Sequence, residues 1–91
     1  FVISVNAKEV DSSLPETETL CVQGVIDCYF EYDGKIILVD YKTDVYETPS
    51  EVAIKYSKQL YYYEKALKAK YKTKNVQKFL YLMHKNDIIE V

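Results

Sequence analysis

The chain has 91 residues, of which 48% are hydrophobic and 29% are charged, and its formal net charge is −2. These values are typical of one small soluble globular domain, and no apolar run approaches the roughly 20 residues that a membrane-spanning helix needs. We therefore expect no membrane partner. Because the sequence begins without methionine, inside an alternating apolar stretch, we expect residues 1–91 to be a single partial domain cut from a longer protein.

The charges divide unevenly between the two halves of the chain. Residues 1–50 hold three lysines and ten acidic residues, a balance of −7, whereas residues 51–91 hold nine lysines and four acidic residues, a balance of +5. An acidic half that holds a metal, beside a lysine-rich half, would suit a phosphodiester ligand. The alternative is that the lysines form an ordinary solvated helix face.

The first elements in chain order are predicted strands. The alternating pattern of Phe1–Val10 predicts a strand, and the serines and proline of Asp11–Thr19 predict a loop. Two apolar runs then flank Asp33-Gly34, which is the strongest short signal for a hairpin with a two-residue type I′ turn. The strands of this hairpin are predicted to cover Leu20–Tyr32 and Lys35–Thr43.

The register of the hairpin decides where its charged residues meet. A two-residue turn pairs Tyr32 with Lys35, and this register places Asp27 directly opposite Asp40. Lys42 follows two residues later and lies on the same face. Opposed acids are unfavourable unless something compensates for their charges, and a divalent cation would do so. The alternative is a solvated face with scattered charges, and a slip of one residue would separate the two acids.

Residues 36–39 form a continuous apolar run just before Asp40. Such a run has apolar side chains on both faces, so it predicts a central strand that is covered on both sides. Acidic side chains at the end of a buried strand need partners.

The two cysteines are predicted to be free thiols. Cys21 and Cys28 are seven residues apart on one predicted strand, on opposite faces and about 23 Å apart at ~3.3 Å per residue. They cannot form a disulfide in that arrangement, and they give no basis for an iron–sulfur cluster. Free thiols suit a reducing compartment, so we expect a cytoplasmic protein.

A long helix is predicted after the polar connection Asp44–Glu47. Thr48-Pro49-Ser50-Glu51 has the pattern of a capping box with proline at the first helical position. We expect the helix to continue to about Lys70. Residues spaced by threes and fours form its buried stripe, and they are Val52, Tyr56, Gln59, Leu60, Tyr63 and Leu67.

Gln59 is the polar member of that stripe. A buried amide needs a hydrogen-bond partner. Gln59 is either a satisfied residue at the edge of the core, or it reaches the acidic patch together with Tyr63, which lies one turn further along the same face.

The remaining patterns predict two more strands, Val76–His84 and the short Ile88–Val91, with a turn at Asn86-Asp87. The order of the elements is therefore strand, strand, strand, helix, strand, with a short strand at the end. This order predicts an α/β or α+β fold in which the long helix packs on a mixed β-sheet.

Three segments together resemble one enzyme superfamily. The residues are Asp27 in Gly-x-x-Asp, Asp40-Tyr41-Lys42-Thr43-Asp44, and Gln59-Leu60-x-x-Tyr63. In order and spacing they are similar to the PD-(D/E)XK nucleases, and more closely to the RecB-type nuclease domain at the C-terminal end of AddA-like ATP-dependent helicase–nuclease subunits. The similarity runs from about residue 23 to residue 82. It implies a restriction-endonuclease-like core, a mixed sheet with a central hairpin.

The resemblance also implies roles for individual residues. Asp27, Asp40 and the backbone carbonyl of Tyr41 would bind Mg²⁺ or Mn²⁺, because these ions prefer oxygen ligands. Lys42 would orient the attacking water and stabilise charge on the phosphate. The residues implied as catalytic are Asp27, Asp40, Lys42, Gln59 and Tyr63.

The implied function is that of a metal-dependent deoxyribonuclease, an exonuclease, within a bacterial helicase–nuclease that repairs double-strand breaks. Its partners would be single strands of unwound DNA and a second, AddB-like subunit. In such domains a further acidic ligand and a histidine lie upstream, so we expect the isolated chain to be inactive or weak. His84 does not match that histidine, and Glu16, Glu18 and Glu31 are interpreted as loop or solvent-face charges.

Two other functions stay open at this point. One is a stand-alone exonuclease of the same superfamily, of the CRISPR-associated type, although such enzymes usually have a cysteine set that Cys21 and Cys28 do not supply. The other is a non-catalytic nuclease-fold module that binds DNA or a partner protein, in which Tyr61 and Tyr62 would stack on bases.

Overall fold

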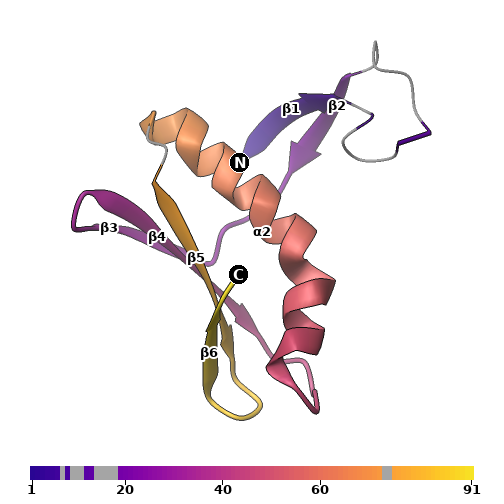
Figure 1. The fold of residues 1–91 in the computed structure, drawn as a ribbon. Coiled ribbons are helices and arrows are strands. Elements are labelled where there is room, and N and C mark those ends of the chain that lie inside the picture. The colour runs from indigo at the N-terminus through magenta and orange to yellow at the C-terminus, as the bar shows by residue number, and fades with distance from the viewer. Residues whose placement is uncertain (7, 9–11, 14–18, 73–74) are drawn as a thin grey trace.

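The computed structural model describes residues 1–6, 8, 12–13, 19–72 and 75–91. It contains a two-stranded antiparallel ribbon, a mixed four-stranded sheet in the order β3-β4-β5-β6, and one long helix (Figure 1). The elements are β1 (Val2–Asn6), β2 (Thr19–Gln23), β3 (Cys28–Tyr32), β4 (Lys35–Lys42), α2 (Pro49–Tyr71), β5 (Val76–Leu82) and β6 (Asp87–Glu90). The predicted α/β architecture, a mixed sheet with a long packed helix, is confirmed. No helix in the described part of the chain is both long and apolar enough to cross a membrane.

The β3–β4 hairpin has the predicted register. Tyr32 pairs with Lys35, and the ladder continues to Cys28 opposite Val39, one residue short of Asp27 and Asp40. Asp33 and Gly34 both have positive φ, 52° and 75°, as a type I′ turn requires. β4 is an interior strand of the sheet, and β3 lies at its edge.

The predicted strand Leu20–Tyr32 is wrong, because the structure breaks it at residues 24–27. β2 ends before the break and pairs with β1, and only β3 joins the main sheet. The break lies where Gly24 packs against two aromatic rings. A Cβ on Gly24 would lie 3.0 Å from ring carbons of Phe1 and 3.2 Å from Tyr63 Cε1. Gly24 and Phe1 also exchange two main-chain hydrogen bonds, so the chain is held there as it leaves the ribbon.

The boundaries near the N-terminus also differ from the prediction. The strand predicted over Phe1–Val10 ends at Asn6, and Thr19 belongs to β2 rather than to the predicted loop. Residues 7, 9–11 and 14–18 of these two segments lie outside the described residues. The free thiols of Cys21 and Cys28 lie on β2 and β3, so the predicted separation along one strand does not apply.

Helix α2 begins at Pro49 as predicted, but the capping box is incomplete. The Thr48 side chain makes no capping hydrogen bond, because the Glu51 N–H donates to the Thr48 main-chain oxygen instead. The Glu51 carboxylate accepts a hydrogen bond from the Glu47 N–H at 3.4 Å, one residue before the predicted position. The helix ends at Lys72, which has the left-handed conformation.

β5 runs parallel to β4, so the chain must cross over the sheet between them, and α2 makes this connection. β5 ends at Leu82 rather than His84, and β6 begins at Asp87, one residue earlier than predicted. Asn86 has a positive φ of 55° in the turn between them.

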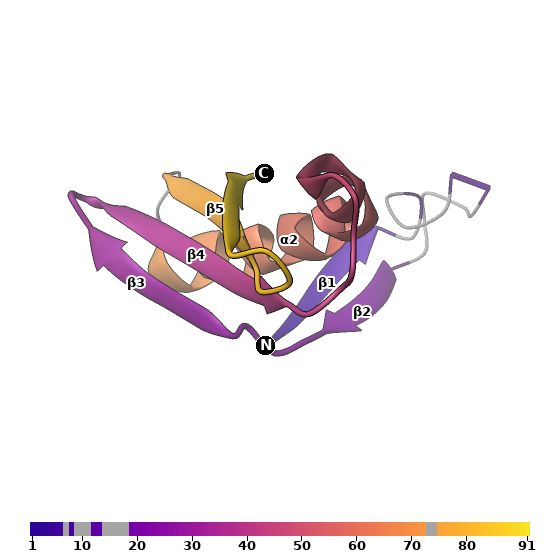
Figure 2. The ribbon, with the colours of Figure 1, turned by 90° about the horizontal axis from the view of Figure 1, so that it is seen from below.

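The core lies between α2 and one face of the sheet (Figure 2). Its most buried side chains are Leu38, Leu60, Leu67, Leu80 and Leu82. On the opposite face no second layer is present among the described residues, and Phe30, Tyr41 and Ile88 are exposed there. The predicted cover on both faces of β4 is therefore met only on the helix side.

Leu80→Ala is expected to lower the free energy of unfolding by about 2–5 kcal/mol, because it leaves a cavity in the core. Leu80 is 0% exposed, whereas Ile88, on the uncovered face, is 63% exposed. Ile88→Ala is the matched control and should lose less than about 1 kcal/mol. Urea unfolding followed by circular dichroism measures both, and equal losses would contradict this position of the core.

Candidate functional site

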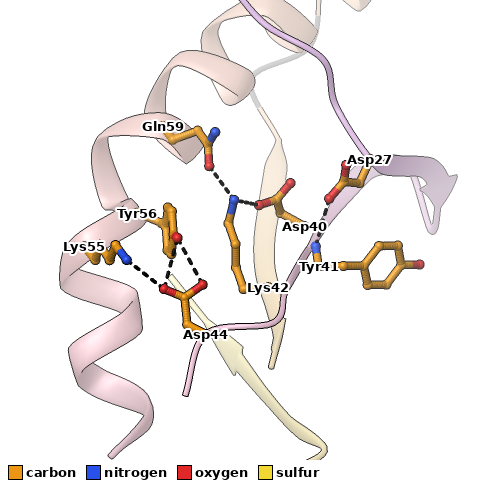
Figure 3. Close-up of polar contacts among 8 residues, drawn as sticks. All are labelled: Asp27, Asp40, Tyr41, Lys42, Asp44, Lys55, Tyr56 and Gln59. Atoms are coloured by element: carbon orange, nitrogen blue, oxygen red, sulfur yellow. Dashed lines mark hydrogen bonds and ion pairs between the residues drawn. The ribbon is translucent and has the colours of Figure 1, made fainter. Parts of the chain in front are cut away.

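The candidate site lies at the carboxyl end of β4, under the first half of α2. The strand alternates there, so Asp40 and Lys42 face the helix, whereas the Tyr41 ring points away from it (Figure 3). The Tyr41 ring packs edge-on against Tyr81 of β5, with 6.0 Å between centroids. The two charged residues thus enter the boundary of the core.

Asp40 is the buried acid of the site. It is 1% exposed, and Lys42 Nζ lies 2.8 Å from its Oδ2 atom. The contact is an ion pair without hydrogen-bond alignment, so this buried oxygen accepts no aligned hydrogen bond. Burial raises the pKa of Asp40; the Lys42 ammonium opposes this shift, and the neighbouring Asp27 adds to it.

Asp27 lies in the bend just before β3 and is exposed to solvent. Its Oδ2 atom accepts a hydrogen bond from the Tyr41 N–H at 3.1 Å. This bond ties the bend to β4 beside Asp40, as the predicted register requires. The structure therefore brings together an exposed carboxylate and a buried one (Figure 3).

Lys42 has three partners. Besides the Asp40 contact, its Nζ atom donates to Gln59 Oε1 at 2.8 Å and lies 4.0 Å from the centroid of the Tyr56 ring. Gln59 thus has the partner that its buried position requires, and of the two interpretations the structure favours the one in which it reaches the acidic patch, through Lys42.

Tyr63 is the innermost aromatic residue near the site. Its ring packs edge-on against Phe1, with 5.3 Å between centroids. Burial raises the pKa of Tyr63, and the negative charge of Asp40 adds to the shift. The hydroxyl therefore stays protonated at neutral pH.

Two residues that the sequence analysis did not assign to the site belong to its surroundings. The Tyr56 hydroxyl donates to the Asp44 carboxylate, at 3.0 Å from each oxygen, and Lys55 Nζ lies 2.8 Å from Asp44 Oδ2. Tyr56 was predicted only as a member of the buried stripe. The signal that would have identified it is its position three residues before Gln59, on the same helix face.

The other predicted candidates lie apart from this cluster. His84 is exposed in the turn after β5, where its ring packs against Tyr46. Glu31 is exposed near the far end of the hairpin, and Glu16 and Glu18 lie outside the described residues. Tyr62 is buried, so its ring is not available to a base, whereas Tyr61 is exposed.

The donors near Asp40 are oxygen atoms, which is the set that Mg²⁺ prefers. In the part of the chain that the structure describes, no group of three or more His, Cys, Asp or Glu side chains is placed to hold a metal ion. The chain's own side-chain donors are therefore Asp27 and Asp40. The buried Asp40 oxygen without an aligned hydrogen bond fits a position that a cation would complete.

Asp40→Asn is expected to make the protein more stable relative to wild type as the pH rises from about 4 toward 7, in the presence of a chelator. The folded-state pKa of Asp40 is raised above its unfolded value, about 3.9. Its contribution to stability is thus present below the unfolded value and lost as the pH rises through the folded value. Urea unfolding at several pH values measures the difference.

Asp44→Asn is the control with the opposite sign. The Lys55 ammonium lowers the pKa of Asp44, so its stabilising contribution is present above the unfolded pKa and lost on acidification below about pH 4. A constant difference between Asp40→Asn and wild type from pH 4 to 7 would contradict the inferred burial of the Asp40 charge.

The comparisons with known proteins give one kind of relative, proteins named as ATP-dependent helicase/nuclease subunits. No family model matches the chain. The chain is similar to part of such a protein from Streptococcus pneumoniae (strain CGSP14), 44% identical over 71 residues, 78% of this chain and 6% of the relative. The proteins of the same name from Clostridium kluyveri (strain ATCC 8527) and Clostridium botulinum (strain Okra / Type B1) are 38% identical over 95 residues and 42% identical over 85 residues. These matches cover 100% and 92% of this chain, and the chain spans 6–8% of the three relatives.

Proposed function

We propose that this chain is the metal-binding core of a DNA nuclease of the PD-(D/E)XK superfamily and RecB type, within a helicase–nuclease subunit that repairs double-strand breaks. The observation that carries the proposal is the buried Asp40 carboxylate, with Lys42 Nζ 2.8 Å away and Asp27 bonded to the next residue of the strand. The names of the relatives, which include both helicase and nuclease, support it.

The metal of the proposed enzyme is Mg²⁺, or Mn²⁺ in its place. Asp27, Asp40 and the backbone carbonyl of Tyr41 would hold it, because hard cations bind carboxylate and carbonyl oxygens. When bound, the ion would polarise the phosphate and lower the pKa of a water molecule that it holds.

The chain's own residues have distinct tasks in this proposal. Lys42 keeps a positive charge at the site and stabilises the negative charge that develops on the phosphate. Gln59 holds the Lys42 ammonium from the side of α2. Tyr63 keeps its proton, so its hydroxyl is a hydrogen-bond donor in the wall of the site.

The proposed substrate is a single strand of DNA, which the helicase part of the same protein would separate from a duplex in the cytoplasm. The relatives are named as subunits and as ATP-dependent, which supports an assembly in which an AddB-like protein is the partner. The balance of +5 over residues 51–91 would attract the phosphates of the strand.

Titration of Mn²⁺ into the ¹⁵N-labelled chain tests the metal site. The paramagnetic ion should selectively broaden amide signals around Asp27, Asp40 and Tyr41, and Asp40→Ala should abolish this effect. Glu31→Ala, an exposed acid on the same hairpin, is the matched control and should leave it unchanged. Broadening that is uniform, or that persists in Asp40→Ala, would count against the metal site.

Lys42→Ala in the full-length helicase–nuclease tests the chemistry. We expect DNA degradation to fall roughly 100-fold or more, because a charge that stabilises the transition state is lost. ATP-dependent unwinding should continue, which separates the defect from misfolding. Lys58→Ala, on the exposed side of α2, is the control. Normal degradation by Lys42→Ala would refute the proposed role of the lysine.

A further inference from the structure

We propose that Tyr56 is a positioning residue for Lys42, and that Asp44 orients the Tyr56 ring for this task. The inference rests on the proposed function, in which the Lys42 ammonium acts on the phosphate. The polar and ring contacts of Tyr56 within the described residues are with Lys42, Asp44 and Lys55, and they do not include Asp27 or Asp40. Tyr56 acts through the lysine.

The contacts of Lys42 show what the ring contributes. An ammonium group has three N–H donors. Its Nζ atom contacts Asp40 Oδ2 and Gln59 Oε1, each at 2.8 Å, and the centroid of the Tyr56 ring lies 4.0 Å away. This distance is well inside the limit of about 6 Å for cation–π attraction. Only 15% of the lysine side chain is exposed, so little water competes with the ring.

The Tyr56 ring is itself fixed by charged groups. Its hydroxyl donates to the Asp44 carboxylate at 3.0 Å, and Lys55 holds that carboxylate from the other side at 2.8 Å (Figure 3). Donation to an anion increases the electron density of the phenol ring, which strengthens the attraction of its face for a cation.

These residues form an alternating series of charges from the core to the solvent. The exposed fraction of the side chain rises from 2% at Asp40 and 15% at Lys42 to 21% at Asp44 and 63% at Lys55. The Tyr56 ring is the link between the inner ion pair and the outer one. We name this series, from Asp40 through Tyr56 to Lys55, the charge ladder.

A bound cation explains why the lysine needs such a link. A divalent ion held by Asp27 and Asp40 would compete with Lys42 for Asp40 and would repel its ammonium group. The face of an aromatic ring is not a ligand for a hard cation such as Mg²⁺. The contact with Tyr56 is therefore one that the metal does not remove, and it keeps the lysine near the phosphate.

The position of Lys42 can be measured without any nuclease activity. In a ¹³C-labelled chain, the ring current of Tyr56 should move the Lys42 Hε signals upfield from those of exposed lysines. Tyr56→Phe should keep this shift, and Tyr56→Leu should lose it. Tyr71→Leu removes a ring that lies near another lysine of the same helix, Lys70, and should not change the Lys42 signals. Lys42 signals at the ordinary position in the wild-type chain would overturn the inference, even if no variant folds.

The kinetic test uses the full-length helicase–nuclease with saturating metal. Tyr56→Leu should lower kcat about 10-fold or more while the KM for DNA changes little, and Tyr56→Phe should restore most of kcat. A wild-type kcat in Tyr56→Leu, in an enzyme that Lys42→Ala inactivates, would overturn the inference and leave the proposed function intact. Full activity in Lys42→Ala would refute the proposed function, and the NMR result would still decide whether Tyr56 positions the lysine.

Discussion

The buried carboxylate of Asp40 is the constraint on which the surrounding structure depends. A charge removed from water is unstable unless other groups compensate for it, and Lys42 supplies the opposite charge from the same strand. The lysine is then also drawn out of water, so it needs partners of its own, Gln59 and Tyr56. Each group creates a demand that the next one satisfies, until the charge ladder reaches solvent at Lys55.

The topology of the sheet and the assembly of the site are one structural problem. Because β4 and β5 are parallel, the chain has to cross over the sheet between them. Helix α2 makes that connection, and its first half carries Tyr56 and Gln59 over the end of β4. The element that the sheet needs for its connectivity therefore also supplies the partners of Lys42.

The sequence predicted those parts of the fold that local patterns determine. Asp33-Gly34 sets the hairpin register, which in turn places Asp27 beside Asp40. The break at Gly24 was not predicted, because it depends on rings that are distant in sequence, those of Phe1 and Tyr63. The hydrogen bond of Tyr56 to Asp44 was missed for a similar reason, since it crosses the connection between β4 and α2, where no periodic pattern indicates it. Local spacing thus predicts which side chains share a face, but not which distant groups they contact.

Tyr41 contributes to the site through its main chain, since its N–H donates to Asp27 while its side chain packs on the other face against Tyr81. A side-chain replacement at this position leaves the donor in place. Alanine scanning would therefore score residue 41 as tolerant, although its peptide group joins the two halves of the acidic pair. The contribution of this position is visible only to chemistry that changes the backbone itself, such as replacement of the amide by an ester.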